Sequence, residues 1–267
     1  MDSLMTAVAT VLTDVAADTI VPMFRRVEAD AHEVTPGEWV TKADLAAEAA
    51  LLPRLTALLP EAGCVAEEAC KVDPRLMDEL HREGLMWLID PLDGTSNYAR
   101  GSQPFRSMVA LVRDGQTVAS WIHDPLSGSM AMAELGSGAW HDGARVRSTP
   151  NVPSPGDVHG SILRRFLPPD VRRRVDANVT GLGEEISGSN CAGDDYVAAA
   201  NGSLDYVLYW RTLAWDHIPG ALFLTEAGGV VRRPDGSDYQ ARTHSLTGLL
   251  AAPNDGTWDL VRSTLLP

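Results

Sequence analysis

The chain of 267 residues has few cysteines, and their number and spacing fit neither a disulfide framework nor a metal site. Cys64, Cys70 and Cys191 are an odd number, so a reducing compartment, and with it a cytoplasmic location, is the simpler expectation. The N-terminal segment lacks the basic residues that begin a signal peptide. No apolar run approaches the ~20 residues of a membrane span. We therefore expect neither secretion nor contact with a membrane.

Positive charge is also scarce. The chain has 22 Lys and Arg against 36 Asp and Glu, a formal net charge of −14, which argues against nucleic acid or an anionic membrane as a partner. The same charge would repel a phosphate substrate unless bound divalent cations reversed it locally. With 45% hydrophobic and 22% charged residues, the composition is that of a globular protein of one large or two modest domains.

The segment from Trp87 to Asn97 is the strongest candidate for chemistry. An apolar run, Met86–Ile89, predicts a buried strand that ends in two carboxylates, Asp90 and Asp93. Because Pro91 cannot donate to a ladder, we expect the chain to leave the sheet there. The two carboxylates and the Leu92 carbonyl then offer three hard oxygen donors, the kind of ligand that Mg²⁺ selects.

The next residues, Gly94, Thr95 and Ser96, suit the N-terminus of a helix, where free N–H groups and the helix dipole favour a phosphate. The alternative is an ordinary Asp-Pro-x-Asp-Gly surface turn. A dication beside a phosphate-binding turn would instead indicate phosphoryl chemistry, and further carboxylates elsewhere in the chain favour that interpretation.

Two other segments supply such carboxylates. A short apolar strand, Gly63–Ala66, ends in Glu67 and Glu68, and its end could meet that of the Met86 strand at one edge of a sheet. Asp216 begins a helix, where an acid alone is usually a cap. A pair of Mg²⁺ ions shares several carboxylates. We therefore expect one metal site formed by Glu67, Asp90, Asp93 and Asp216 with the Leu92 carbonyl.

The first half of the chain predicts an α+β domain over residues 1–149, which carries most of the metal ligands and the phosphate-binding turn. Its expected parts are a helix over Ser3–Ile20, a polar loop over residues 28–38, a helix from Lys42, and antiparallel hairpins between Phe105 and Val146. The apolar face expected for the second helix consists of Leu45, Ala49, Leu52, Leu55 and Leu59.

The proline-rich segment Pro150–Pro155 is the expected linker to an α/β domain over residues 150–267, which supplies Asp216 and the walls that set substrate specificity. Strands and helices alternate there. The expected strands lie at Ser161–Leu163, Glu185–Ser187, Asp205–Tyr209, Gly229–Arg232 and Gly248–Ala252.

Four motifs in this order make the chain resemble the inositol monophosphatase family of Mg²⁺-dependent, lithium-sensitive phosphatases. They are Thr41–Asp44, Ala66-Glu67-Glu68, Asp90–Asn97, and the segment from Trp215-Asp216 to Thr225-Glu226-Ala227-Gly228-Gly229. Alanine at position 66 replaces the family's glycine. The resemblance implies a layered α-β-α-β-α sandwich and a homodimer.

The resemblance also implies a role for each matching residue. Glu67, Asp90, Asp93, Asp216 and the Leu92 carbonyl would hold two or three Mg²⁺ ions, with Mn²⁺ as a substitute. Gly94, Thr95 and Ser96 would bind the phosphate. The catalytic set would be Asp44, Thr95 and Glu67, with the Thr95 hydroxyl bonded to Asp44 and orienting the attacking water.

Three departures concern substrate specificity and leave the metal ligands intact. Tyr209 stands seven residues before Asp216, where inositol-specific members commonly have Glu, and Ser189 lies in the segment that usually flanks the substrate. Glu33 occupies a loop that often carries Lys. We expect Arg211 to contact a second anionic group of the substrate, with a structural ion pair as the alternative.

The leading hypothesis is therefore a Mg²⁺-dependent phosphomonoesterase that acts on a small sugar or polyol phosphate with a metal-activated water. Alternatives within the family are a nucleotide 3′-phosphatase, a fructose-1,6-bisphosphatase or a histidinol-phosphate phosphatase. A non-catalytic phosphate- or metal-binding regulator is the alternative outside the enzymes. A phosphatase of the haloacid-dehalogenase type fits poorly, because Asp90 and Asp93 are separated by two residues rather than one.

Overall fold

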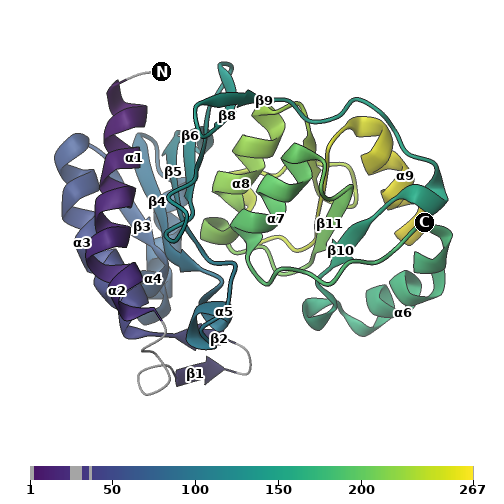
Figure 1. Cartoon of the computed structure of the whole chain (residues 1–267), viewed down its shortest axis with the longest axis horizontal. Coiled ribbons are helices and arrows are strands. Elements are labelled where there is room, and N and C mark those ends of the chain that lie inside the picture. Colours follow the sequence, from purple (N-terminus) through teal and green to yellow (C-terminus); the bar gives the residue numbers. More distant parts are fainter. Residues whose placement is uncertain (1–2, 25–31, 36–37, 267) are drawn as a thin grey trace.

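The computed structural model describes residues 3–24, 32–35 and 38–266. Helices and sheets alternate in layers, as predicted (Figure 1). Helices α1 (Ser3–Val15), α2 (Val21–Met23) and α3 (Lys42–Leu58) cover one face of a large sheet. Helices α7 (Ala192–Asn201) and α8 (Ala214–Glu226) lie between this sheet and a smaller one, and α6 (Pro169–Asn178) and α9 (Asp255–Leu265) lie beyond the smaller sheet.

The large sheet has seven strands in the described chain, in the order β3-β4-β5-β6-β7-β8-β9. Its strands β3 and β4 are parallel and the others pair antiparallel. The predicted hairpin turn at Asp114-Gly115 is confirmed, with positive φ at both residues (53° and 82°). The strands are β3 (Gly63–Ala66), β4 (Leu85–Asp93), β5 (Arg106–Arg113), β6 (Gln116–His123), β7 (Met130–Glu134), β8 (Gly138–His141) and β9 (Ala144–Val146).

The prediction that the chain leaves the sheet at Pro91 is wrong, because β4 continues to Asp93. On one side β3 has already ended, since its last register partner is Ile89. On the other side the register with β5 shifts between Asp90 and Asp93, so Pro91 lies in a bulge where no N–H donor is needed. Its carbonyl accepts a hydrogen bond from the Ser107 hydroxyl at 2.8 Å.

The first helical segment extends slightly further than predicted, from α1 through a short π-helix (Ala16–Ile20) to α2. By length and composition Ser3–Met23 could span a membrane, which corrects the expectation that nothing in the chain approaches such a span. In this structure its inner residues, among them Val8 and Leu12, pack in the core beneath the large sheet. The Trp121 indole N–H donates to the Met5 carbonyl at 3.0 Å and fixes the helix there.

The apolar face predicted for helix α3 is confirmed in part: Leu55 is buried, and Leu52 and Leu59 pack against the core. Leu45, however, is 52% exposed and Ala49 is exposed, whereas Asp44 and Glu48 are buried. Each buried acid has hydrogen-bond donors. The Glu48 carboxylate accepts from the backbone N–H groups of Glu68 and Ala69, at 2.8 and 2.9 Å. It thereby fixes the first turn of α4 (Glu67–Val72), so the buried face of α3 makes polar contacts as well as apolar ones.

The predicted loop over residues 28–38 is partly replaced by two short antiparallel strands, β1 (His32–Thr35) and β2 (Glu38–Val40). Residues 28–31 and 36–37 lie outside the described residues.

In the second half, the described residues form a four-stranded sheet of order β10-β11-β13-β12. Of the predicted strand Glu185–Ser187, Glu185 makes an isolated bridge with Gly160, and the described segment otherwise joins neither sheet. The two sheets fall on either side of the expected domain boundary at residue 150, which stays a prediction. The strands are β10 (Gly160–Ile162), β11 (Tyr206–Tyr209), β12 (Val230–Arg232) and β13 (Leu249–Ala252).

Candidate active site

Two of the predicted metal ligands lie at one edge of the large sheet. The last register pair of the parallel strands β3 and β4 immediately precedes Glu67 and Asp90, so both follow adjacent strands in the same direction. Both residues are buried. Burial raises the pKa of Asp90 well above its usual value, and the nearby charges of Glu67, Asp93 and Asp216 raise it further.

The bulge in β4 brings further donors to the same place. The Leu92 N–H donates to Asp90 Oδ1 at 3.0 Å. One oxygen of Asp93 accepts from the Gly193 N–H at 2.7 Å and from the Cys191 thiol at 3.1 Å. Burial raises the pKa of Asp93 to about 6, although these donors act in the opposite direction. The first residues of α7 thus hold a predicted ligand of the other half of the chain.

Asp216 reaches the site from the first turn of α8. Burial and the charges of Glu67 and Asp93 raise its pKa well above the usual value, while Arg211 and Lys71 act against that rise. A single cavity of about 630 Å³ is lined by all the predicted metal ligands and phosphate-binding residues: Glu67, Asp90, Leu92, Asp93, Asp216, Gly94, Thr95 and Ser96.

The chemistry of the candidate ligands fits a divalent cation. In the present positions of their side chains, no group of three or more His, Cys, Asp or Glu among the described residues could hold an ion. The candidate ligands are oxygen atoms, which Mg²⁺ prefers. Lys71 contacts Glu67 at 2.9 Å and Glu68 at 2.7 Å and so neutralises part of the charge at this end of the cavity. The raised pKa values of Asp90 and Asp216 reflect burial and mutual repulsion, which a bound dication would relieve once the side chains adjusted around it.

The predicted contact between Thr95 and Asp44 is present. The Thr95 hydroxyl lies 3.0 Å from Asp44 Oδ1 and 2.9 Å from the Leu92 carbonyl, so it can donate to either. Asp44 Oδ2 also accepts from the Thr41 N–H at 2.8 Å in the capping box that begins α3. Burial is the main cause that raises the pKa of Asp44 to about 7, with Thr41 opposing it.

Gly94 makes the sharp turn from β4 into the short helix α5 (Thr95–Ala99) with φ of 83°. A Cβ atom at this position would lie 2.9 Å from the Pro104 carbonyl oxygen, so both the conformation and the space require glycine. Downstream, the Asn97 side-chain amide donates to the carbonyls of Pro104 and Ser189, each at 2.8 Å. The candidate phosphate-binding turn is therefore tied to the second half of the chain.

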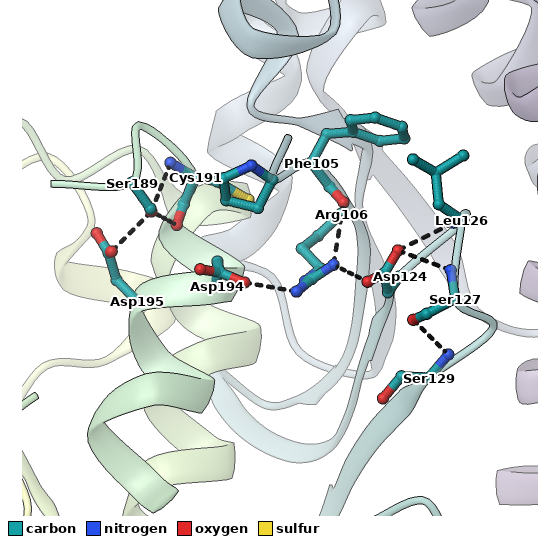
Figure 2. Close-up of polar contacts among 12 residues, drawn as sticks. Phe105, Arg106, Asp124, Leu126, Ser127, Ser129, Ser189, Cys191, Asp194 and Asp195 are labelled. Atoms are coloured by element: carbon teal, nitrogen blue, oxygen red, sulfur yellow. Dashed lines mark hydrogen bonds and ion pairs between the residues drawn. The ribbon is translucent and has the colours of Figure 1, made fainter. Parts of the chain in front are cut away.

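Arg106 adds an ionic link between the halves. Its guanidinium contacts Asp124 and Asp194, each at 2.5 Å, and Figure 2 shows it between the two carboxylates. Arg106, in β5, is also the register partner of Asp93 in β4. This contact holds the start of α7 beside the bulge that carries the acids.

Two of the predicted specificity residues meet at an acid that sequence reasoning missed. The Ser189 hydroxyl donates to Asp195 Oδ1 at 2.7 Å (Figure 2), and the Tyr209 hydroxyl donates to Asp195 Oδ2 at 2.9 Å. Burial raises the pKa of Asp195 to about 6 against the effect of both donors. Asp195 and Tyr209 both line the cavity. This chain has no Glu at position 209, but it has a carboxylate at the cavity wall from Asp195 in α7. No signal in the sequence marked Asp195 among its acidic neighbours.

The third predicted specificity residue, Arg211, also lines the cavity, beside two residues that sequence reasoning missed, Arg165 and Phe166. Both guanidinium groups lie over the Phe166 ring, with Arg165 Cζ 4.8 Å and Arg211 Cζ 4.2 Å from its centroid. The sequence analysis singled out neither Arg165 nor Phe166.

Comparison with known proteins gives a consistent result. The model of the inositol monophosphatase family matches residues 1–264. An inositol-1-monophosphatase from Mesorhizobium japonicum is 34% identical over 215 residues, 75% of this chain and 74% of that protein. A 3′(2′),5′-bisphosphate nucleotidase CysQ from Aggregatibacter actinomycetemcomitans is 29% identical over 233 residues, 83% of each chain. The solved structure of the extragenic suppressor protein suhB from Bartonella henselae superimposes with a TM-score of 0.85 at 23% identity over 99% of both chains.

Proposed function

The chain belongs to the inositol monophosphatase family, whose members are metal-dependent phosphatases, and we propose that it hydrolyses a small sugar or polyol phosphate with Mg²⁺ as cofactor. The observation that carries this proposal is that four acids from three elements, α4, β4 and α8, line one cavity together with Thr95, whose hydroxyl lies within hydrogen-bond distance of Asp44. Bound Mg²⁺ lowers the pKa of a coordinated water and neutralises charge on the phosphate. Glu67, Asp90, Asp93 and Asp216 with the Leu92 carbonyl would hold two or three such ions.

Thr95 and Asp44 handle the proton in this proposal. The Thr95 hydroxyl holds the attacking water and donates its own hydrogen to Asp44, so a proton lost by the water can be passed toward the carboxylate. With a pKa of about 7, Asp44 accepts a proton readily near neutral pH. Oxygen from the water bonds to phosphorus, and the bond from phosphorus to the alcohol oxygen breaks. The alcohol oxygen takes up a proton from solvent and Asp44 releases its proton to solvent, so the products are the alcohol and inorganic phosphate.

The turn at Gly94 orients the phosphate. The first N–H groups of a helix have no partner within it, and the N–H groups of Thr95 and Ser96 stand at that position in α5.

We also propose a homodimer in the cytoplasm. Three free cysteines suit a reducing compartment, and light scattering after size exclusion would measure the oligomeric state.

The test is a panel of phosphate monoesters assayed with Mg²⁺, with and without Li⁺. Hydrolysis of a sugar or polyol phosphate supports the proposal. Activity on no ester would favour a phosphate- or metal-binding regulator instead.

Asp90→Asn tests the metal assignment. We expect turnover to fall by about a thousandfold or more, because the loss of a ligand charge costs several kcal/mol of transition-state stabilisation. Calorimetric Mg²⁺ affinity should fall as well, while circular dichroism shows an intact fold. Asp235→Asn, an equal change at an exposed loop residue, is the control. Wild-type turnover in the Asp90 variant would refute the assignment.

A further inference from the structure

The helix that carries the candidate metal ligand Glu67 begins without a cap of its own. Glu67 is the first residue of α4, and its N-cap residue is Ala66, whose methyl side chain cannot accept a hydrogen bond. The first N–H groups of a helix have no partner within it. Since Ala66, Glu67 and Glu68 are all buried, another part of the chain has to supply the acceptors.

Glu48 of α3 supplies two such acceptors. Its Oε2 accepts from the Glu68 N–H at 2.8 Å, and its Oε1 accepts from the Ala69 N–H at 2.9 Å. Hydrogen bonds to a carboxylate are strong, and the helix dipole favours a negative charge at this end. The ion pairs of Lys71 lie within α4 and cannot fix that helix relative to α3. The two bonds to Glu48 do so, because they join one helix to the other.

Glu48 also lies one helical turn beyond Asp44. Residues with this spacing are on the same face of a helix, and both of these acids are buried. Asp44 lies 3.0 Å from the Thr95 hydroxyl. One face of α3 therefore carries the candidate proton acceptor at one position and holds the start of α4 at the next, so the place of Glu67 relative to Asp44 depends on Glu48.

We propose that Glu48 is a positioning residue for the metal site: by capping α4 from α3, it holds Glu67 where its carboxylate can bind Mg²⁺. This inference rests on the proposed function, which makes Glu67 a metal ligand. Glu48 is not among the described residues that line the cavity, so it acts through the backbone of α4 rather than by touching the ion. Loss of a group that holds a metal ligand lowers metal affinity by roughly 10- to 100-fold.

The experiment measures Mg²⁺ binding by calorimetry in Glu48→Ala and Glu48→Gln. Alanine removes both acceptors, and we expect the Kd for Mg²⁺ to rise by at least about tenfold. Glutamine keeps one oxygen, while its amide nitrogen would face the second backbone N–H, so we expect a smaller rise of about threefold. Glu61→Ala, which removes an equal charge from an exposed position between α3 and β3, is the control and should keep the wild-type Kd.

Two further measurements separate positioning from a general loss of stability. In EDTA, hydrogen exchange of the peptide that contains Glu68 and Ala69 should be at least about tenfold faster in Glu48→Ala, with exchange in β4 unchanged. In the phosphatase assay the Mg²⁺ concentration for half-maximal activity should rise, while kcat at saturating Mg²⁺ stays within about threefold of the wild-type value. A purely structural role would lower the unfolding temperature and leave the Kd of the folded protein unchanged.

An unchanged Kd for Mg²⁺ in Glu48→Ala, or unchanged exchange in the α4 peptide, would overturn the inference and leave the phosphatase proposal standing. An equal rise of the Kd in Glu61→Ala would also overturn it, because the effect would then come from net charge. If Glu48→Ala does not fold, Glu48→Gln decides by the same criteria. If the wild-type protein itself binds no Mg²⁺, the metal assignment of the proposed function fails, and this inference fails with it.

Discussion

Asp44→Asn offers the sharpest test of the electrostatics at this site. The pKa of Asp44 is about 7 in the folded chain against 3.8 in the unfolded chain, chiefly because the carboxyl is buried. Folding therefore takes up a proton between these pH values. The resulting stabilisation is complete below pH 3.8 and is lost as the pH rises through 7. A difference of about 3 pKa units corresponds to about 4 kcal/mol over the whole window, and roughly 2 to 3 kcal/mol of it falls between pH 5 and 8.

Asparagine keeps the shape of the side chain and removes its titration. We expect the free energy of unfolding of Asp44→Asn, minus that of the wild-type protein, to increase by roughly 2 to 3 kcal/mol from pH 5 to pH 8. Urea unfolding in EDTA at each pH measures it without bound metal. Asp235→Asn should show no such increase, because Ser237 donates to that exposed carboxylate and lowers its pKa. A difference between Asp44→Asn and wild type that stays constant with pH would show that Asp44 ionises normally.

Two further substitutions test neighbouring contacts. Lys71→Met leaves Glu67 and Glu68 without their shared ammonium, so the unfolding temperature in EDTA should fall by about 2–4 °C and Mg²⁺ should then raise it by more than in the wild-type protein. An unchanged unfolding temperature in EDTA would contradict this. Tyr209→Phe removes a 2.9 Å hydrogen bond to the buried Asp195, which should cost about 1–3 kcal/mol in urea unfolding and raise KM more than it lowers kcat. If KM and stability both match the wild-type values, Asp195 does not depend on Tyr209.

The placement of the acids at one end of the cavity could be predicted because it follows from local sequence. A strand that ends in an acid places that acid at a sheet edge, and two parallel strands place their acids at the same edge. Glu67 and Asp90 obey this rule. The contact between Thr95 and Asp44 also follows the motifs, although 51 residues separate the two.

Rules that depend on one residue type were less reliable. Proline was expected to end β4, but Pro91 occupies the one stretch where neither neighbouring strand needs its N–H. Leucine spacing predicted the buried face of α3 only in part: Leu45 is exposed, while Asp44 and Glu48 are buried and tolerate burial because they have backbone or hydroxyl donors. In both cases the tertiary partner, which the sequence does not show, decides the outcome.

The substrate could be predicted least, and the contacts between the two halves explain why. Asp93 belongs to the first half, yet one of its oxygens is held by Gly193, and Arg106 is paired with Asp194. The motifs that predict phosphoryl chemistry lie mostly in the first half, while Asp195, Arg165, Phe166 and Arg211 line the cavity from the second. Because these second-half residues meet the motifs through folding rather than through spacing in the sequence, related chains can keep the acids and still differ in the esters that they select.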